Sequence, residues 1–91
     1  MKRLRWSAEK NQLLRQTRGV SFEEVAFHIE RDKVLDVRKH PNEERYPHQK
    51  IFVIDLGDYV YLVPFVEDEE EIFLKTIIPS RKATKELRPD D

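Results

Sequence analysis

The chain has no cysteine and only two glycines among its 91 residues, and each of these shortages excludes particular kinds of functional site. Without cysteine there is no disulfide framework, no thiolate metal site and no thiol nucleophile. Because Gly19 and Gly57 stand alone, the chain cannot form a glycine-rich loop that cradles phosphates. No group of residues has the spacing of a zinc site either. We therefore expect an activity that uses no metal and no cofactor.

Long apolar runs are also missing. The longest nearly uncharged apolar stretch, Tyr59 to Val66, is far too short to span a bilayer. Basic residues open the chain but no apolar run follows them, so no signal peptide is visible. The composition, 38% hydrophobic and 38% charged, is that of one small globular domain over residues 1–91. We expect a cytoplasmic protein with no membrane partner.

The formal net charge of −1 hides an uneven distribution. Residues 1–50 carry 12 Lys and Arg against 8 Asp and Glu, whereas residues 51–91 carry 5 against 10. Six basic residues lie within the first twenty, opposed only by Glu9. A strongly basic domain would point to a nucleic-acid partner, and this chain is not strongly basic. Composition alone therefore does not favour RNA binding.

A short strand and two helices are predicted in the first third of the chain. Lys2 to Trp6 alternates between polar and apolar residues, as a half-buried strand does. Ser7 is placed to cap a helix that ends near Gly19. The best-marked element is a helix over Ser21–Glu30, because Ser21 and Glu24 form a capping box in front of residues at helical spacing.

The rest of the chain is predicted to be mostly strand, because its apolar periodicity changes to two. The expected strands cover Val34–Lys39, Ile51–Leu56, Tyr59–Val66 and Ile72–Ile78. Short links join the last three strands, so we expect them to form an antiparallel meander. Pro64 cannot donate a main-chain hydrogen bond, so it should lie at an edge or a bulge.

A short helix is predicted to end the chain. Ser80 can cap it, Ala83 and Leu87 should face the sheet, and the segment from Pro89 to Asp91 should end it. The predicted order is β-α-α-β-β-β-β-α, with a mostly antiparallel sheet flanked by helices. That order is typical of a small α+β domain.

Two separated stretches resemble one known family. The opening LRWSAEKN (Leu4–Asn11), followed by RGVSFEEV (Arg18–Val25), is similar to the start of BrnT toxins. The ending IIPSRKATKEL (Ile77–Leu87) resembles their closing strand and helix. The middle, from His40 to Lys75, is similar to a widespread subgroup of BrnT-like toxins. The resemblance thus covers nearly the whole chain.

One departure from the family pattern concerns the residues ahead of the second helix. The family typically has Lys-His-Gly there, whereas this chain has Thr17-Arg18-Gly19. If that histidine serves RNA contact or chemistry, its role has passed to Arg18 or has been lost. Arg18 is therefore a candidate RNA-binding residue.

The resemblance implies a RelE-like fold and a metal-independent endoribonuclease of a type II toxin–antitoxin system. Such a toxin cleaves RNA and inhibits growth or translation. It also implies a cognate antitoxin, usually of the ribbon-helix-helix type, encoded beside the toxin and neutralising it. The complex would bind operator DNA only through the antitoxin.

Metal-free RNA cleavage needs a base for the 2′-hydroxyl, cations for the phosphate and an acid for the leaving oxygen. The strongest cationic candidates are Arg81, Lys82 and Lys85, because two of them share a helix face and lie near a helix N-terminus that could help to hold a phosphate. Lys75 should share a strand face with Phe73 and Ile77, where a lysine is either snorkelling or functional. An ordinary solvated helix face explains the three helix cations equally well.

The connection from His40 to His48 contains histidine, glutamate and tyrosine, which are side-chain types that transfer protons. His40, Glu44, Tyr46 and His48 are candidates for the acid and the base, and Arg45 is a candidate for RNA contact. Polar residues are also what any surface loop contains, so the structural interpretation stays open.

Two tyrosines share one face of the strand Tyr59–Val66. We expect one of them to pack in the core and leave the other open, with Tyr61 as the candidate for stacking on an RNA base.

Two other function classes stay open at this point. The chain could be a toxin-like binding module that engages an antitoxin or nucleic acid without cleaving it, which the near-neutral charge and the missing histidine favour. It could also be a structural protein whose basic N-terminal part binds nucleic acid.

Overall fold

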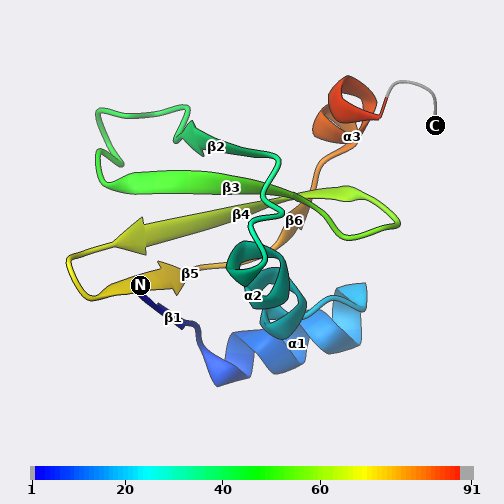
Figure 1. The fold of residues 1–91 in the computed structure, drawn as a ribbon, viewed down its shortest axis with the longest axis horizontal. Helices are drawn as coiled ribbons and strands as arrows, with labels where there is room; N and C mark the ends of the chain where they lie inside the picture. The colour runs from blue at the N-terminus through cyan, green and yellow to red at the C-terminus, as the bar shows by residue number, and fades with distance from the viewer. Residues whose placement is uncertain (1, 89–91) are drawn as a thin grey trace.

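Residues 2–88, which the computed structural model describes, fold into three helices and a mixed six-stranded sheet (Figure 1). The elements are β1 (Arg3–Arg5), α1 (Ala8–Arg18), α2 (Phe22–Glu30), β2 (Asp36–Lys39), β3 (Gln49–Asp55), β4 (Val60–Glu67), β5 (Glu71–Leu74), β6 (Ile78–Pro79) and α3 (Arg81–Leu87). The predicted α+β class is confirmed. Pro89, Asp90 and Asp91, which we expected to end the last helix, lie outside the described residues.

The helices begin at the serines that the sequence predicts. Ser7 Oγ accepts a hydrogen bond from the Lys10 N–H at 3.2 Å, and Ser21 Oγ accepts one from the Glu24 N–H at 3.3 Å. Each contact satisfies a main-chain donor that the first helical turn leaves free. Gly19 ends α1 with φ 67°, a left-handed conformation that glycine adopts without a side-chain clash.

The sheet has the order β1-β5-β4-β3-β2, and β6 also pairs with β4. β1 runs parallel to β5, whereas the other pairs are antiparallel. The predicted meander of the three central strands is therefore confirmed. α1 and α2 pack against one face of this sheet, as Figure 1 shows, and α3 lies at the other side near the end of β3.

The predicted single strand over residues 72–78 is wrong. β5 ends at Leu74 and β6 begins at Ile78, and the register against β4 shifts by one residue between them. The break lies opposite Pro64, whose nitrogen has no proton to donate to that side of the strand. The Pro64 carbonyl accepts a hydrogen bond from the Lys75 N–H at 2.8 Å. Pro64 thus faces a bulge, as its chemistry predicts.

Two apolar clusters lie on opposite faces of the sheet because side chains alternate along β3 and β4. Phe52 and Ile54 join the large cluster under α1 and α2, whereas Val53 joins a small cluster with Val60 and Ala83 of α3. Ala83 is 2% exposed and faces the sheet as expected. The expectation that Leu87 does so too is wrong, since it is 40% exposed.

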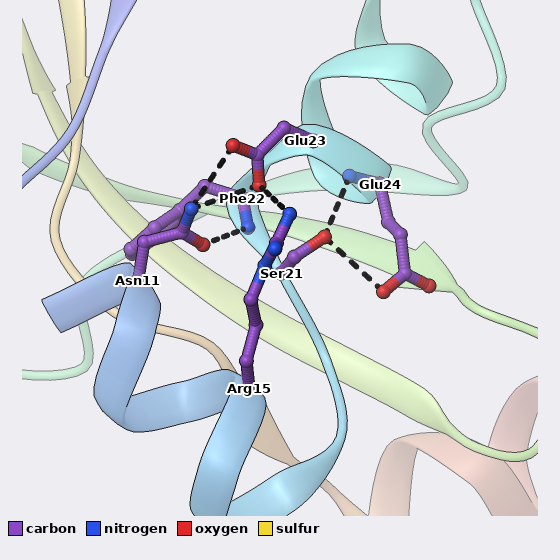
Figure 2. A network of polar contacts seen from close by, with 6 residues as sticks. All are labelled: Asn11, Arg15, Ser21, Phe22, Glu23 and Glu24. Atoms are coloured by element: carbon purple, nitrogen blue, oxygen red, sulfur yellow. Dashed lines mark hydrogen bonds and ion pairs between the residues drawn. The ribbon is translucent and has the colours of Figure 1, made fainter. Parts of the chain in front are cut away.

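A buried amide connects the two packed helices (Figure 2). The Asn11 Oδ1 atom accepts a hydrogen bond from the Phe22 N–H at 2.8 Å, and its Nδ2 donates to both carboxylate oxygens of Glu23 at 2.8 and 3.0 Å. Arg15 donates to the same carboxylate at 3.1 Å. The hydrogen bonds from the Asn11 amide are the main reason that the pKa of Glu23 lies below its usual value. α1 therefore supplies the partners for the first turn of α2.

Replacement of this amide should destabilise the whole domain. In Asn11→Leu the side chain keeps a similar size but cannot accept from Phe22, which leaves a buried N–H without its partner. We expect the free energy of unfolding in urea to fall by about 1–3 kcal/mol. Gln12→Leu, on the exposed side of the same helix, is the control and should change it little. Equal stability of the two variants would contradict the role of Asn11.

Candidate functional site

Apart from Lys75, the candidate residues gather at the two ends of the β3–β4 hairpin. β3 has seven residues, so its ends lie roughly 20 Å apart at about 3.3 Å per residue. We call one end, at the Gly57–Asp58 turn, the turn end; α1 ends and α3 begins there, on the right of Figure 1. We call the other end, with the connection 40–48, the loop end. Residues from both ends cannot act on one phosphate.

Arg18 is held at the turn end by a hydrogen bond that spans the chain. Its Nη1 donates to the Ile77 carbonyl at 2.6 Å, across 59 residues of sequence. Ile77 is fully buried and leads into β6, so the contact ties the end of α1 to the segment that precedes α3. A guanidinium has five N–H groups, so Arg18 keeps donors for a ligand. The expected RNA contact thus shares this side chain with a structural role.

Tyr61 packs in the core, and the expectation that it stacks on an RNA base is wrong. Its side chain points to the face that α1 and α2 cover, and the residue is only 4% exposed. Its hydroxyl donates to Asp58 Oδ2 at 3.0 Å. Burial, and then this hydrogen bond and the charge of Asp58, raise the pKa of Tyr61 to about 12. Tyr59, whose ring meets that of Tyr61 edge-on at 6.3 Å, is the half-buried member of the pair.

Two carboxylates at the turn end were missed by the sequence analysis. The charges of Asp58 and Glu24 raise the pKa of the Tyr61 hydroxyl, while that of Arg18 lowers it, and of these three side chains Asp58 is the one hydrogen-bonded to the hydroxyl. The capping box had already explained Glu24, whose carboxylate accepts from the Ser21 hydroxyl at 3.2 Å. Asp58 lies in a turn, where aspartate is common. Neither position carried a separate signal of function.

The three cations of α3 are exposed and lie close to the turn end. The Ser80 N–H donates to the Val60 carbonyl at 2.9 Å, which sets the start of α3 beside the first residue of β4. Among residues 2–88, Arg81, Lys82 and Lys85 have no acidic partner within ion-pair distance. The expected phosphate site at the helix N-terminus is not supported, because α3 has only seven residues and Ser80 Oγ already accepts the Ala83 N–H.

Lys75 lies in the bulge between β5 and β6. It was expected to share a face with Phe73 and Ile77. It lies across from Pro64 as Phe73 lies across from Val66, on one face of the sheet, but the expectation for Ile77 is wrong, because the bulge turns that residue to the other face. Lys75 is exposed whereas Ile77 is fully buried. Its main chain bonds to Pro64, whose side chain points away from α1 and α2. Its ammonium group also has no carboxylate within ion-pair distance in the described part of the chain.

Three of the loop candidates are brought together. The rings of His40 and Tyr46 lie 4.5 Å apart, and the Arg45 guanidinium carbon lies 5.6 Å from the Tyr46 ring centroid. The Asn42 N–H donates to His40 Nδ1 at 3.0 Å, so in the neutral ring the Nε2 atom carries the proton. The His40 N–H continues the β2–β3 ladder by donating to the Gln49 carbonyl at 3.2 Å.

Glu44 and His48 are not part of this group. Both are exposed, and neither side chain makes a hydrogen bond or ion pair with another residue in the range 2–88. A shallow hollow of about 240 Å³ is lined by Tyr46 and by the ion pair of Lys39 and Glu43 at 3.7 Å, and neither Glu44 nor His48 lines it. The loop therefore offers one His–Tyr–Arg group rather than five converging side chains.

Two absences complete the description of residues 2–88. These residues contain no group of three or more His, Asp or Glu that could hold a metal ion. None of their helices is long and apolar enough to cross a membrane.

Comparison of the chain with models of protein families, with curated proteins and with solved structures gave no match.

The Tyr61 hydroxyl should lose its proton at a higher pH than an ordinary tyrosine, and this ionisation should lower the stability of the fold at high pH. Its folded pKa of about 12 lies above the ordinary value of 10.0. The protonated hydroxyl therefore stabilises the fold fully below pH 10, and this contribution is lost as the pH rises through 12. In absorbance titrations, Tyr61→Phe should remove an ionisation near 12. Tyr46→Phe, which removes an exposed tyrosine, is the control and should leave that ionisation in place.

Proposed function

We propose that this chain is a BrnT-like toxin with a RelE-like fold, an endoribonuclease that cleaves RNA in the cytoplasm without a metal ion. A cognate ribbon-helix-helix antitoxin would neutralise it, and the complex would reach operator DNA only through that antitoxin. The observation that carries the proposal is the Arg18–Ile77 hydrogen bond. It joins the two stretches that resemble the family, Arg18–Val25 and Ile77–Leu87, although they are far apart in sequence.

The unpaired cations support an anionic substrate. Arg81, Lys82, Lys85 and Lys75 are exposed, and within residues 2–88 no carboxylate neutralises them. Cations without acidic partners are available to phosphate oxygens, and each such contact makes binding fall with salt. The net charge of the whole chain is near zero, so this local excess is a better guide to the substrate than composition.

The turn end also holds groups for proton transfer. In the proposed reaction, a carboxylate accepts the proton of the 2′-hydroxyl, and the 2′-oxygen attacks the phosphorus. The 5′-oxygen then leaves with a proton from a lysine ammonium, and a 2′,3′-cyclic phosphate remains. Glu24 and Asp58, whose charges act on the Tyr61 hydroxyl as that of Arg18 does, are the candidate bases, and Lys82 or Lys85 is the acid. Arg18 and Arg81 stabilise the charge on the phosphate.

The loop end is too distant to share that phosphate, so its residues would bind the RNA elsewhere along its length. Arg45 and Tyr46 present a cation and an aromatic ring together, a combination that suits an unstacked base. His40, Glu44 and His48 would then act in binding rather than as the acid and base of cleavage. Lys75 would contact the RNA backbone between the two ends.

A second function is favoured by one specific observation. Arg18 occupies the position of the family histidine and is bonded to the Ile77 carbonyl, while both imidazoles of the loop lie at the opposite end of β3. A toxin-like module that engages its antitoxin without cleaving RNA fits this separation. Expression of the chain in bacteria distinguishes the two functions.

Expression in bacteria tests the proposal directly. The chain alone should arrest growth and create new RNA 5′ ends, and the neighbouring antitoxin should relieve both effects. The combined variant Arg81→Ala/Lys82→Ala/Lys85→Ala should lower cleavage of purified RNA at least tenfold while antitoxin binding is retained. Lys33→Ala, at an exposed lysine of the α2–β2 connection, is the control.

The alternatives give different results in the same assays. Tyr46→Ala and His48→Ala should weaken RNA binding without changing the cleavage positions, and loss of cleavage in these variants alone would move the reaction to the loop end. Normal growth and intact RNA with the soluble wild-type chain would contradict the ribonuclease function and favour the module that binds its antitoxin without cleaving RNA.

A further inference from the structure

The free edge of β2 is the feature of the fold that no part of the proposed function explains. β2 is the last strand of the sheet order and forms its upper rim in Figure 1. The His40 N–H donates to the Gln49 carbonyl of β3. Along an antiparallel strand the main-chain groups of alternate residues point to the same side, so those of Asp36 and Arg38 also point toward β3. The N–H and C=O groups of Val37 and Lys39 therefore point to the open side.

Apolar side chains accompany this open edge. Val37 is 51% exposed and lies opposite Phe52, on the face of the sheet that bears α2, and Leu35, just before β2, is 48% exposed. The Val37 N–H is held only by the carboxylate of its neighbour Asp36 at 2.9 Å, a contact that a pairing strand can replace. The other carboxylate oxygen of Asp36 accepts from Arg38 Nε at 3.1 Å. Hydrophobic side chains beside unpaired main-chain groups form a surface that can accept another strand.

The charges on this edge are complementary to the same edge rotated by a two-fold axis. The antiparallel registers that bring the outward main-chain groups of two copies of β2 together differ in the charges that they set opposite each other. Registers centred on Asp36, on Arg38 or on Lys39 set that residue against its own copy, and each of them repels. The register centred on Val37 sets Asp36 against Arg38 of the second copy, twice. Only this register is free of repulsion.

The other free edge of the sheet lacks this property. β1 has three residues, of which Arg3 and Arg5 are both cationic. Self-pairing of β1 would bring cations together, because it has no acidic residue of its own. The contrast makes β2 the self-complementary edge.

We propose that two copies of this chain associate through β2, in antiparallel register with Val37 opposite Val37 of the second copy. The two six-stranded sheets then continue into one another. The Asp36 and Arg38 side chains of the two copies then alternate in sign across the face opposite to Val37. The association depends neither on ribonuclease activity nor on an antitoxin, so its test is independent of the proposed function.

Single-cysteine variants test the register, because the chain has no cysteine of its own. In the proposed pairing, the two Val37 Cα atoms lie about 5.5 Å apart, which a disulfide can bridge. The two Leu35 Cα atoms lie roughly 13 Å apart, which it cannot. Under mild oxidation Val37→Cys should become mostly covalent dimer, while Leu35→Cys, with nearly the same exposure, should stay monomeric. Equal cross-linking of both variants, or none, would overturn the register.

Charge exchange tests the same contact without a covalent bond. In ultracentrifugation the wild type should sediment as a dimer at high concentration. Asp36→Arg alone and Arg38→Asp alone should be monomeric, and a mixture of the two variants should form the dimer again, since each charge then meets its opposite. Glu69→Arg, in the exposed β4–β5 turn, is the control and should remain dimeric. A monomeric wild type, or a mixture that stays monomeric, would refute the proposal.

Discussion

The position of the two long helices depends on one buried amide. Asn11 is 8% exposed, and its side chain uses both its oxygen and its nitrogen on the first turn of α2. Phe22, whose N–H it accepts, is fully buried and stacks with Trp6 at 5.8 Å. Because the amide sets how α2 meets α1, it also sets the end of α1, where Arg18 reaches the Ile77 carbonyl. A largely buried polar contact between two helices thereby helps to position the candidate site.

A second constraint acts from the sheet. Pro64 has no N–H for the strand on its β5 side, so that strand bulges after Leu74 and continues as β6. The bulge exposes Lys75, buries Ile77 and directs the chain into α3 beside Val60. The bulge opposite Pro64 therefore contributes to the position of the cations that we assign to phosphate binding. The same sheet leaves β2 as a free edge, so the proposed site and the proposed self-association use different parts of the molecule.

Much of the local structure was predictable because it depends on residues close in sequence. Ser7, Ser21 and Ser80 each accept from the N–H three residues later, and Gly19 ends a helix in a conformation that other residues adopt poorly. The bulge at Pro64 was predictable as well, since it follows from the chemistry of one residue. What could not be foreseen was which partner strand would bulge, because that depends on register between strands.

The sequence by itself determined the helix caps, the change of period from helix to strand and hence the α+β class, since each is a short-range property. Only the tertiary structure decided which candidate residues meet. It separated His40 and Tyr46 from the cations of α3 by the length of a strand, buried Tyr61 in the core, and placed its hydroxyl in a hydrogen bond with Asp58. Side-chain chemistry can be read along the chain, whereas distances between side chains arise only when strands pair and helices pack.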